Sequence, residues 1–289
     1  MKQMAAFIHL SRFYFLPLPM LVYAVGVAVA RHERAALDDR LLVIELLVQL
    51  SVAYLNDYWD MPTDRINTQR TLLSGGSGVL TTGVLPPVVA PVAAAICQGG
   101  AFLLAIWAGV PRISWLLLIL AMGAAVFYTT PPVKLCWRGL GELATALVAA
   151  LLVPQWAYSL QTRTLSGDVL LLGLPLVPFV MSAFVAIAAP DYEADRQVGK
   201  RTLPVRLGER RIAPLYAGLL ALGYLASLVI WTGHVLPGVL IATAFSLPLG
   251  IWAWMGLRAP IGTRRQTLLV IVRAGLVPLI VITALNWGI

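Results

Sequence analysis

The feature that most limits the fold of this chain is a succession of long apolar runs separated by short polar connections. The runs are about 17–24 residues long, which is enough for an α-helix to cross a hydrocarbon core of ~30 Å. Hydrophobic residues make up 60% of the 289 positions and charged residues 12%, whereas a soluble domain carries roughly 25% charged residues. We therefore expect an all-α, polytopic membrane protein.

The apolar runs predict about nine transmembrane helices. No soluble domain or low-complexity stretch interrupts them, so we expect a single domain over residues 1–289. The first run ends in a signal-peptide-like Ala-Val-Ala sequence, but Arg12, Pro17 and Pro19 interrupt it, and we interpret it as a retained helix. The nine expected spans are 13–30, 41–58, 86–109, 113–129, 139–161, 168–189, 212–232, 235–257 and 266–286.

The basic residues predict which ends of the spans face the cytoplasm. Fifteen of the 21 Lys and Arg residues fall at the N-terminus and in the connections after spans two, four, six and eight. The opposite side holds five, namely Arg31, Arg34, Arg40, Arg112 and Arg163. By the positive-inside rule the richer side is cytoplasmic. We therefore expect a multi-pass protein of the cell inner (cytoplasmic) membrane.

Acidic residues are scarce and concentrated in two places. Six of the 13 acidic residues belong to the clusters Asp57, Asp60, Asp64 and Asp191, Glu193, Asp195. Each cluster follows an apolar run, and the predicted topology places both at the cytoplasmic side. Carboxylates at membrane depth are costly unless they are paired or bind a metal, so these groups are functional candidates.

The spacing within the clusters predicts convergent carboxylates. On one continuous helix Asp57, Asp60 and Asp64 would fall within an arc of ~60°, and Asp191 and Asp195 form an i, i+4 pair. Pro62 predicts a helix break near Met61. Oxygen ligands without His or Cys suit Mg²⁺, which shares its sites with phosphate oxygens. The alternative is that these carboxylates face water at helix ends.

Basic residues surround both acidic clusters. Together with Mg²⁺, Arg and Lys side chains can hold a diphosphate and stabilise it as a leaving group. The alternative for these bases is contact with anionic lipid headgroups. The Ser74–Gly78 stretch (SGGSG) could present backbone amides to phosphate or act as a flexible connector. Glu142 could pair with Arg138, and Tyr58, Tyr128 and Tyr192 could stabilise a carbocation or anchor the helices at the interface.

The sequence around both clusters resembles the UbiA superfamily of intramembrane prenyltransferases. Asn56-Asp57-x-x-Asp60-x-x-x-Asp64 is similar to its first aspartate-rich motif, and Asp191-x-x-x-Asp195 with the 199–208 segment is similar to its second. Tyr128-Thr-Thr-Pro-Pro-Val-Lys134 and Arg138-Gly-Leu-Gly-Glu142 resemble signatures of the branch related to dihydroxynaphthoate polyprenyltransferases of menaquinone synthesis. The resemblance covers essentially the whole chain, with Trp59 and Pro62 as departures.

The resemblance implies a helical bundle around a central cavity. It also implies Mg²⁺-dependent transfer of a polyprenyl group to an aromatic quinone precursor, for which we expect a dihydroxynaphthoate-like ring. Two Mg²⁺ ions would be held by Asn56, Asp57, Asp60, Asp64, Asp191 and Asp195. The implied catalytic residues are Asp60, Asp64, Asp191, Asp195 and Lys134. The implied diphosphate-binding residues are Arg12, Arg65, Arg70, Lys134, Arg138, Lys200 and Arg201.

Two other functions remain open at this stage. A terpene cyclase of the same superfamily would use the same site without an acceptor, and a secondary transporter of an anionic lipid or metabolite would need no chemistry. The expected partners are a polyprenyl diphosphate, an aromatic acceptor and membrane lipids, with no nucleic acid and no obligate protein partner. The identity of the acceptor, the prenyl chain length, the oligomeric state and a general base do not follow from the sequence.

Overall fold

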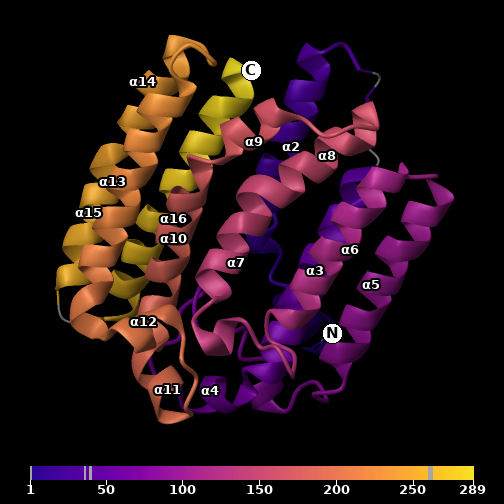
Figure 1. Ribbon diagram of the computed structural model, residues 1–289. Helices are drawn as coiled ribbons and strands as arrows, with labels where there is room; N and C mark the ends of the chain where they lie inside the picture. Colours follow the sequence, from indigo (N-terminus) through magenta and orange to yellow (C-terminus); the bar gives the residue numbers. More distant parts are fainter. Residues whose placement is uncertain (1, 36, 39–40, 260–262) are drawn as a thin grey trace.

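The computed structural model describes residues 2–35, 37–38, 41–259 and 263–289, so Arg40 of the topology count lies outside the described residues. The described part of the chain is a bundle of helices without a strand (Figure 1). The predicted all-α class is confirmed.

The first half of the chain begins with a bent pair of helices. Arg12 adopts a left-handed conformation (φ 47°) that separates them, so the second helix begins at Pro17 and not at the predicted residue 13. Proline is well suited to the first turn of a helix because its missing N–H has no intrahelical partner there. The helices are α1 (Lys2–Leu10), α2 (Pro17–His32), α3 (Leu42–Trp59), α4 (Met61–Ile66), α5 (Val89–Trp107) and α6 (Arg112–Phe127).

The second half contains shorter and interrupted helices. The predicted span 168–189 is broken at Leu174 and Pro175, which separate two helices. A π-helical segment, Val148–Leu152, joins α7 to α8. The helices are α7 (Gly141–Leu147), α8 (Val153–Thr162), α9 (Gly167–Gly173), α10 (Leu176–Ala188), α11 (Tyr192–Gln197), α12 (Leu203–Leu207), α13 (Ile212–Trp231), α14 (Pro237–Phe245), α15 (Leu247–Arg258) and α16 (Arg264–Gly288).

Six helical segments in the described ranges are long and apolar enough to cross a membrane, and the bent pair of 2–15 with α2 makes up to seven. The other two predicted spans correspond to α6, which has 16 residues, and α3, which carries Glu45, Asn56 and Asp57. The count of nine therefore stays a prediction. The six segments are 89–107, 141–162, 176–197, 209–231, 237–258 and 264–288.

The helices pack into one bundle because each contacts neighbours from distant parts of the sequence. α2 packs on α8, α3 on α5, and α10 on α7, α13 and α16, while α16 also reaches α2. Small residues permit the closest approach: a Cβ at Gly26 would lie 2.0 Å from the carbonyl oxygen of Pro154. Such contacts are typical of helices that associate in a membrane. The short helices α4 and α11 meet at one end of the bundle, where the acidic clusters lie (Figure 1).

Candidate functional site

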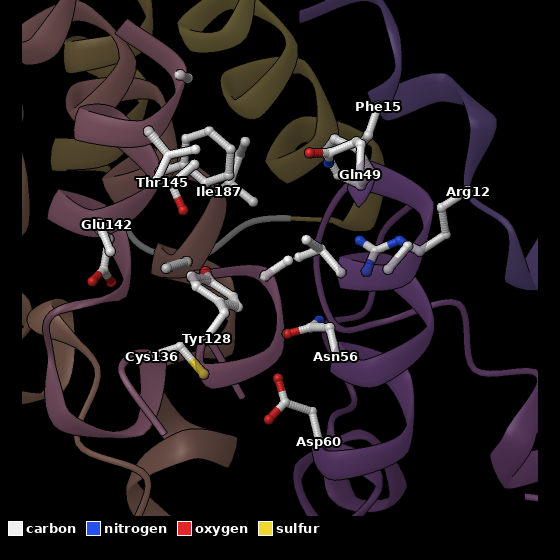
Figure 2. A pocket seen from close by; sticks show the side chains of 18 of the residues that line it. Arg12, Phe15, Gln49, Asn56, Asp60, Tyr128, Cys136, Glu142, Thr145 and Ile187 are labelled. Carbon is white, nitrogen blue, oxygen red and sulfur yellow. The ribbon is translucent and has the colours of Figure 1, made fainter. Parts of the chain in front are cut away.

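A cavity of about 230 Å³ lies inside the bundle and extends to the end that holds α4 and α11. Its walls come from α2, α3, α6, α7, α8 and α10, and they are largely apolar away from the acidic residues. Figure 2 shows Asn56 and Asp60 on one side of this cavity, and Tyr128, Glu142 and Thr145 on the opposite side. The site therefore combines an apolar interior with a polar end.

The two acidic clusters reach this cavity from different helices. Asp60 and Asp64 come from the junction of α3 with α4, and Asp191 and Asp195 come from the end of α10 and from α11. All four residues line the cavity. The helix break at Pro62 is confirmed, because α3 ends at Trp59 and α4 begins at Met61. The break turns Asp64 back toward the cavity.

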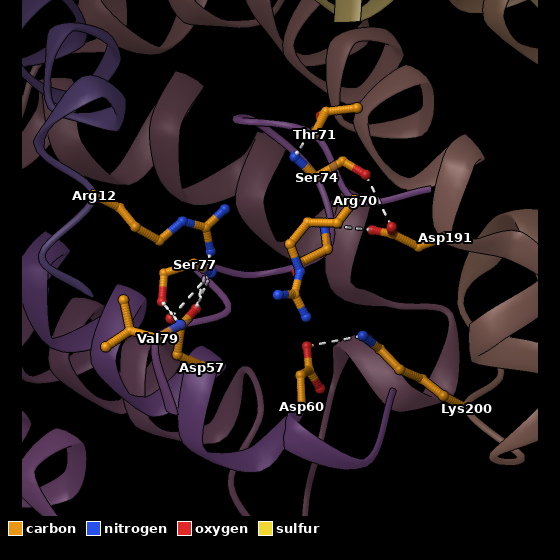
Figure 3. Close-up of polar contacts among 11 residues, drawn as sticks. Arg12, Asp57, Asp60, Arg70, Thr71, Ser74, Ser77, Val79, Asp191 and Lys200 are labelled. Atoms are coloured by element: carbon orange, nitrogen blue, oxygen red, sulfur yellow. Dashed lines mark hydrogen bonds and ion pairs between the residues drawn. The ribbon is translucent and has the colours of Figure 1, made fainter. Parts of the chain in front are cut away.

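Lys200 joins the two clusters. Its ammonium Nζ donates to Asp60 Oδ2 at 2.8 Å and lies 3.4 Å from Asp195 Oδ1. Burial alone would lower the pKa of Lys200, but Asp60 and Asp195 raise it well above its usual range. Trp137 Nε1 donates to the second oxygen of Asp60 at 2.8 Å. Lys200 is thus charged, and it neutralises part of the acidic site (Figure 3).

The SGGSG stretch closes over the site and binds carboxylates. Asp191 accepts hydrogen bonds from Asn67 Nδ2 at 2.6 Å, Ser74 Oγ at 2.9 Å and the amide of Gly75 at 3.1 Å. Asp57 accepts from the amide of Ser77. The sequence suggests that the backbone amides of this stretch bind phosphate, but two of them, those of Gly75 and Ser77, donate to carboxylates. The stretch thereby connects the two acidic clusters (Figure 3).

Arg70 holds this stretch against α4. Its Nε donates to the carbonyl of Gly75 at 2.8 Å, and its Nη2 donates to the carbonyl of Asp64. Burial, followed by the neighbouring Asp60 and Asp57, raises the pKa of Asp64 to about 9. A group of carboxylates this close and this buried is stabilised by additional positive charge.

Gly76 lies against Asp64 so closely that a side chain does not fit. A Cβ at this position would be 2.0 Å from Asp64 Oδ2, and the φ of +67° already disfavours other residues. We expect Gly76→Ala to displace the Asp64 carboxylate and to lower turnover by about 10²-fold, since misplacing a reacting group by ~1 Å has effects of that size. Steady-state kinetics measures this loss. Gly83→Ala is the matched control, because Gly83 has a similar φ and an added Cβ meets nothing there.

Asp57 lies in a different environment from the other predicted ligands. It is 2% exposed, does not line the cavity, and pairs with Arg12 at 3.4 Å between Oδ1 and Nη1. Arg12 itself lines the cavity and also stacks on Phe15. We therefore omit Asp57 from the metal ligands proposed below and assign it the role of orienting Arg12.

The remaining predicted residues divide between the cavity and the surface. Asn56 and Tyr128 line the cavity. Lys134 does not; its ammonium stacks on Trp137 and Trp59, at 4.2 and 5.5 Å from the ring centroids. Four of the others are absent from the cavity lining and lie at or near the surface: Arg65, Arg138, Arg201 and Tyr192. Tyr58 packs edge-on against Trp59 and also lies outside the lining.

The carboxylates that line the cavity fit Mg²⁺ if a bound ligand supplies part of the coordination shell. Within the described residues, no three Asp, Glu, His or Cys side chains converge closely enough to hold a metal ion by themselves. Mg²⁺ is usually bound by one or two carboxylates together with substrate phosphates and waters, and not by an all-protein cage. Two pairs of carboxylates on one cavity provide this partial set.

Sequence reasoning missed Trp137, Asn67, Ser74 and Ser77 as partners of the acidic residues. Trp137 lies between Lys134 and Arg138, two of the basic residues expected to bind the diphosphate. A single indole or amide gives no periodic signal, so only its position in the fold shows the contact. Ser74 and Ser77 lie in the SGGSG stretch, for which the sequence predicts either backbone amides that bind phosphate or a flexible connector. The glycines of this stretch take positive φ angles that allow its closed shape.

These features define a polytopic helical membrane protein with an apolar cavity closed at one end by carboxylates and bases. The sequence model of the UbiA prenyltransferase family matches residues 13–285, and the chain belongs to this family. The fold agrees with this family assignment. A UbiA homologue from Archaeoglobus fulgidus, solved bound to DMAPP and Mg²⁺, superimposes with a TM-score of 0.71 at 16% identity over 96% of both chains.

Two curated relatives are 25% and 27% identical to this chain over the residues that align with it. The 1,4-dihydroxy-2-naphthoate octaprenyltransferase of Bacillus subtilis is 25% identical over 65% of this chain and 61% of its own length. The homogentisate geranylgeranyltransferase of Triticum aestivum is 27% identical over 75% of this chain and 54% of its own. The chain thus spans somewhat more than half the length of these two relatives. A digeranylgeranylglyceryl phosphate synthase structure also superimposes, with a TM-score of 0.65 at 17% identity over 100% of this chain and 99% of the other.

Proposed function

We propose that this protein is a Mg²⁺-dependent prenyltransferase that transfers a polyprenyl group from an allylic diphosphate to an aromatic quinone precursor. The observation that carries the proposal is the meeting of Asp60, Asp64, Asp191 and Asp195 on one apolar cavity beside the buried Lys200. The relatives named for naphthoate and homogentisate acceptors support an aromatic acceptor. A ring resembling 1,4-dihydroxy-2-naphthoate is the specific acceptor that we propose.

The polar end of the cavity would bind the diphosphate. Asn56, Asp60, Asp64, Asp191 and Asp195 would hold Mg²⁺, for which we propose two ions, and the metal would supply positive charge to the phosphate oxygens. Lys200 and Arg12 line the same end and would contact the diphosphate directly. The Asn67–Gly78 segment keeps the carboxylates in place through its bonds to Asp191 and Asp57.

The apolar walls would hold the prenyl chain and keep water from the allylic carbon. Leu18, Val22, Val48 and Val148 are among the residues that provide this surface. Tyr128 presents an aromatic ring to the same cavity, where it could face the positive charge that develops as the C–O bond breaks. The electron-rich acceptor ring then forms the new C–C bond, the diphosphate leaves with the bonding electrons, and the ring loses a proton.

We further propose that the protein lies in the cell inner membrane and that its site is on the cytoplasmic side. The basic residues predicted on the cytoplasmic side include Lys200, Arg201, Arg264 and Arg265. Of these, Lys200 forms an ion pair with Asp60 of the first acidic cluster. Arg264 Nε donates to the carbonyl of Arg70, which attaches the start of α16 to the same end of the bundle. Labelling of single cysteines from either side of sealed vesicles measures this orientation.

Product analysis tests the proposed function. Purified protein is incubated with geranyl, farnesyl or geranylgeranyl diphosphate, with 1,4-dihydroxy-2-naphthoate or homogentisate, and with or without Mg²⁺. We expect a prenylated aromatic product that requires both Mg²⁺ and an acceptor. A hydrocarbon or terpene alcohol formed without acceptor would instead indicate a terpene cyclase, and the absence of any diphosphate consumption would contradict the proposal.

A further inference from the structure

Glu142 is a buried carboxylate whose hydrogen bonds are only half satisfied. It lies in the first turn of α7, is 5% exposed, and lines the cavity. Its Oε1 accepts a hydrogen bond from the amide of Leu203 at 3.3 Å. Its Oε2 is buried and has no partner among the described residues. Most buried polar atoms in proteins have a partner, so this oxygen requires an explanation.

The partner expected from the sequence does not satisfy Glu142. Arg138 is exposed, and its Nη2 donates to the carbonyl of Pro132 at 2.8 Å. Lys200 lies on the same cavity, but its ammonium is bound to Asp60 and Asp195. The second oxygen of Glu142 therefore has no protein partner among the described residues, although Glu142 itself lines the cavity.

A second buried polar group lies beside Glu142. Thr202 directly precedes Leu203, the residue that donates to Glu142, and it also lines the cavity. It is 4% exposed, and its Oγ1 has no partner in the part of the chain that the structure describes. Thr145 and Tyr128 lie on the same side, across the cavity from Asn56 and Asp60 (Figure 2).

We propose that Glu142 and Thr202 form the subsite for a hydroxyl group on the aromatic acceptor. The carboxylate oxygen accepts a hydrogen bond from the ring hydroxyl, and Thr202 Oγ1 bonds to the hydroxyl oxygen. This inference rests on the proposed function, since it requires a phenolic acceptor. Glu142 lies on the wall opposite Asn56 and Asp60 (Figure 2), so the acceptor ring is placed between Glu142 and the diphosphate. The hydrogen bond to a carboxylate also makes the ring carbon beside the hydroxyl more electron-rich.

The hydrogen-bonding pattern excludes an apolar occupant at this position. An isoprene unit against Glu142 and Thr202 would leave both oxygens without a partner, which is unfavourable. The apolar chain is better accommodated by the aliphatic residues of α2 and α3 on other parts of the same cavity. The acceptor hydroxyl and the prenyl chain therefore occupy different parts of the cavity.

Binding measurements test the subsite without relying on turnover. The protein in detergent is loaded with Mg²⁺ and a thiolo analogue of geranyl diphosphate, and the dissociation constant of 1,4-dihydroxy-2-naphthoate is measured by calorimetry. We expect Glu142→Gln to raise this constant about tenfold or more, and Thr202→Val to raise it several-fold, as expected for hydrogen bonds to a charged and a neutral group. The dissociation constant of the donor analogue should stay within twofold of wild type.

A methyl ether of the acceptor hydroxyl sharpens this test. Wild type should bind the ether about tenfold more weakly than the free hydroxyl compound, whereas Glu142→Gln should discriminate much less between the two. Thr243→Val is the matched control, because Thr243 is also buried with an unpartnered hydroxyl in the described structure but lies in α14, outside the cavity lining. Its acceptor affinity should equal that of wild type.

The outcomes separate the subsite from the proposed function. If wild type binds the hydroxynaphthoate but never prenylates it, the proposed function fails and the subsite stands. If Glu142→Gln binds the acceptor as tightly as wild type, or still discriminates fully against the ether, the subsite is wrong whatever the turnover shows. A wild-type protein that binds no hydroxylated ring also overturns it.

Discussion

Asp60→Asn should lower prenyl transfer by about 10³-fold while the protein keeps its helical fold, a loss typical of removing a preorganised electrostatic contact. Asparagine preserves the size of the side chain but removes its negative charge, so the variant loses a proposed metal ligand and the partner of Lys200. The donor affinity should fall in parallel, because the metal and the diphosphate bind together. Turnover with a saturating aromatic acceptor and a titration of Mg²⁺ measure both effects.

Glu193→Gln provides the matched control for this experiment. Glu193 belongs to the second acidic cluster, yet it is exposed and its carboxylate pairs with Arg196 at 3.1 Å, away from the cavity. An exposed pair of this kind contributes little to stability. If Glu193→Gln keeps full activity while Asp60→Asn loses most of it, the loss is due to the position of Asp60 on the cavity and not simply to the removal of a negative charge from the acidic clusters. If Asp60→Asn retained more than a tenth of wild-type turnover, the proposed site would be wrong.

The sequence was sufficient to predict the helical class and the gathering of acidic residues, because both depend on patterns that persist over many residues. Hydrophobic runs identify helices in a membrane irrespective of their neighbours. The spacing of Asp60, Asp64, Asp191 and Asp195 on the same side of the predicted topology indicated a shared site. The break at Pro62 also followed from local chemistry.

The direction of individual side chains could not be predicted in this way. A continuous helical wheel placed Asp57 beside Asp60 and Asp64, but α3 ends between them at Trp59, so the three residues no longer share one helix face. Asp57 instead meets Arg12, which comes from the bend between α1 and α2. Contacts of this kind depend on how separate helices pack, and nothing in the local sequence specifies them.

The same limit applies to Glu142. Glu142 follows Arg138 by four positions, a spacing that suggests a local ion pair, but the 3-10 turn Cys136–Arg138 and the left-handed Gly139 interrupt the helix between them. Arg138 consequently lies at the surface while Glu142 faces inward. The interruption converts an expected surface pair into a buried carboxylate with an unpartnered oxygen.

Lys200→Met should destabilise the metal-free protein and make its stability depend strongly on Mg²⁺ and the donor. The ammonium of Lys200 is buried between Asp60 and Asp195, and removing one partner of such a group costs about 3–5 kcal/mol because the remaining charges are uncompensated. In a thermal unfolding assay this corresponds to a shift on the order of 10 °C. Methionine keeps most of the length of the lysine side chain, so the effect arises from charge.

Mg²⁺ with a prenyl diphosphate analogue should restore more stability to Lys200→Met than to wild type, because the added cations replace the missing ammonium between the carboxylates. Lys134→Met is the control, because Lys134 lies on the faces of Trp137 and Trp59 and has no carboxylate partner among the residues that the structure describes. Such contacts contribute only about 0.5–1 kcal/mol. Its unfolding temperature should change little and respond to Mg²⁺ as wild type does. Equal stabilisation of wild type and Lys200→Met by Mg²⁺ and the analogue would show that the four carboxylates do not share one cation-binding site.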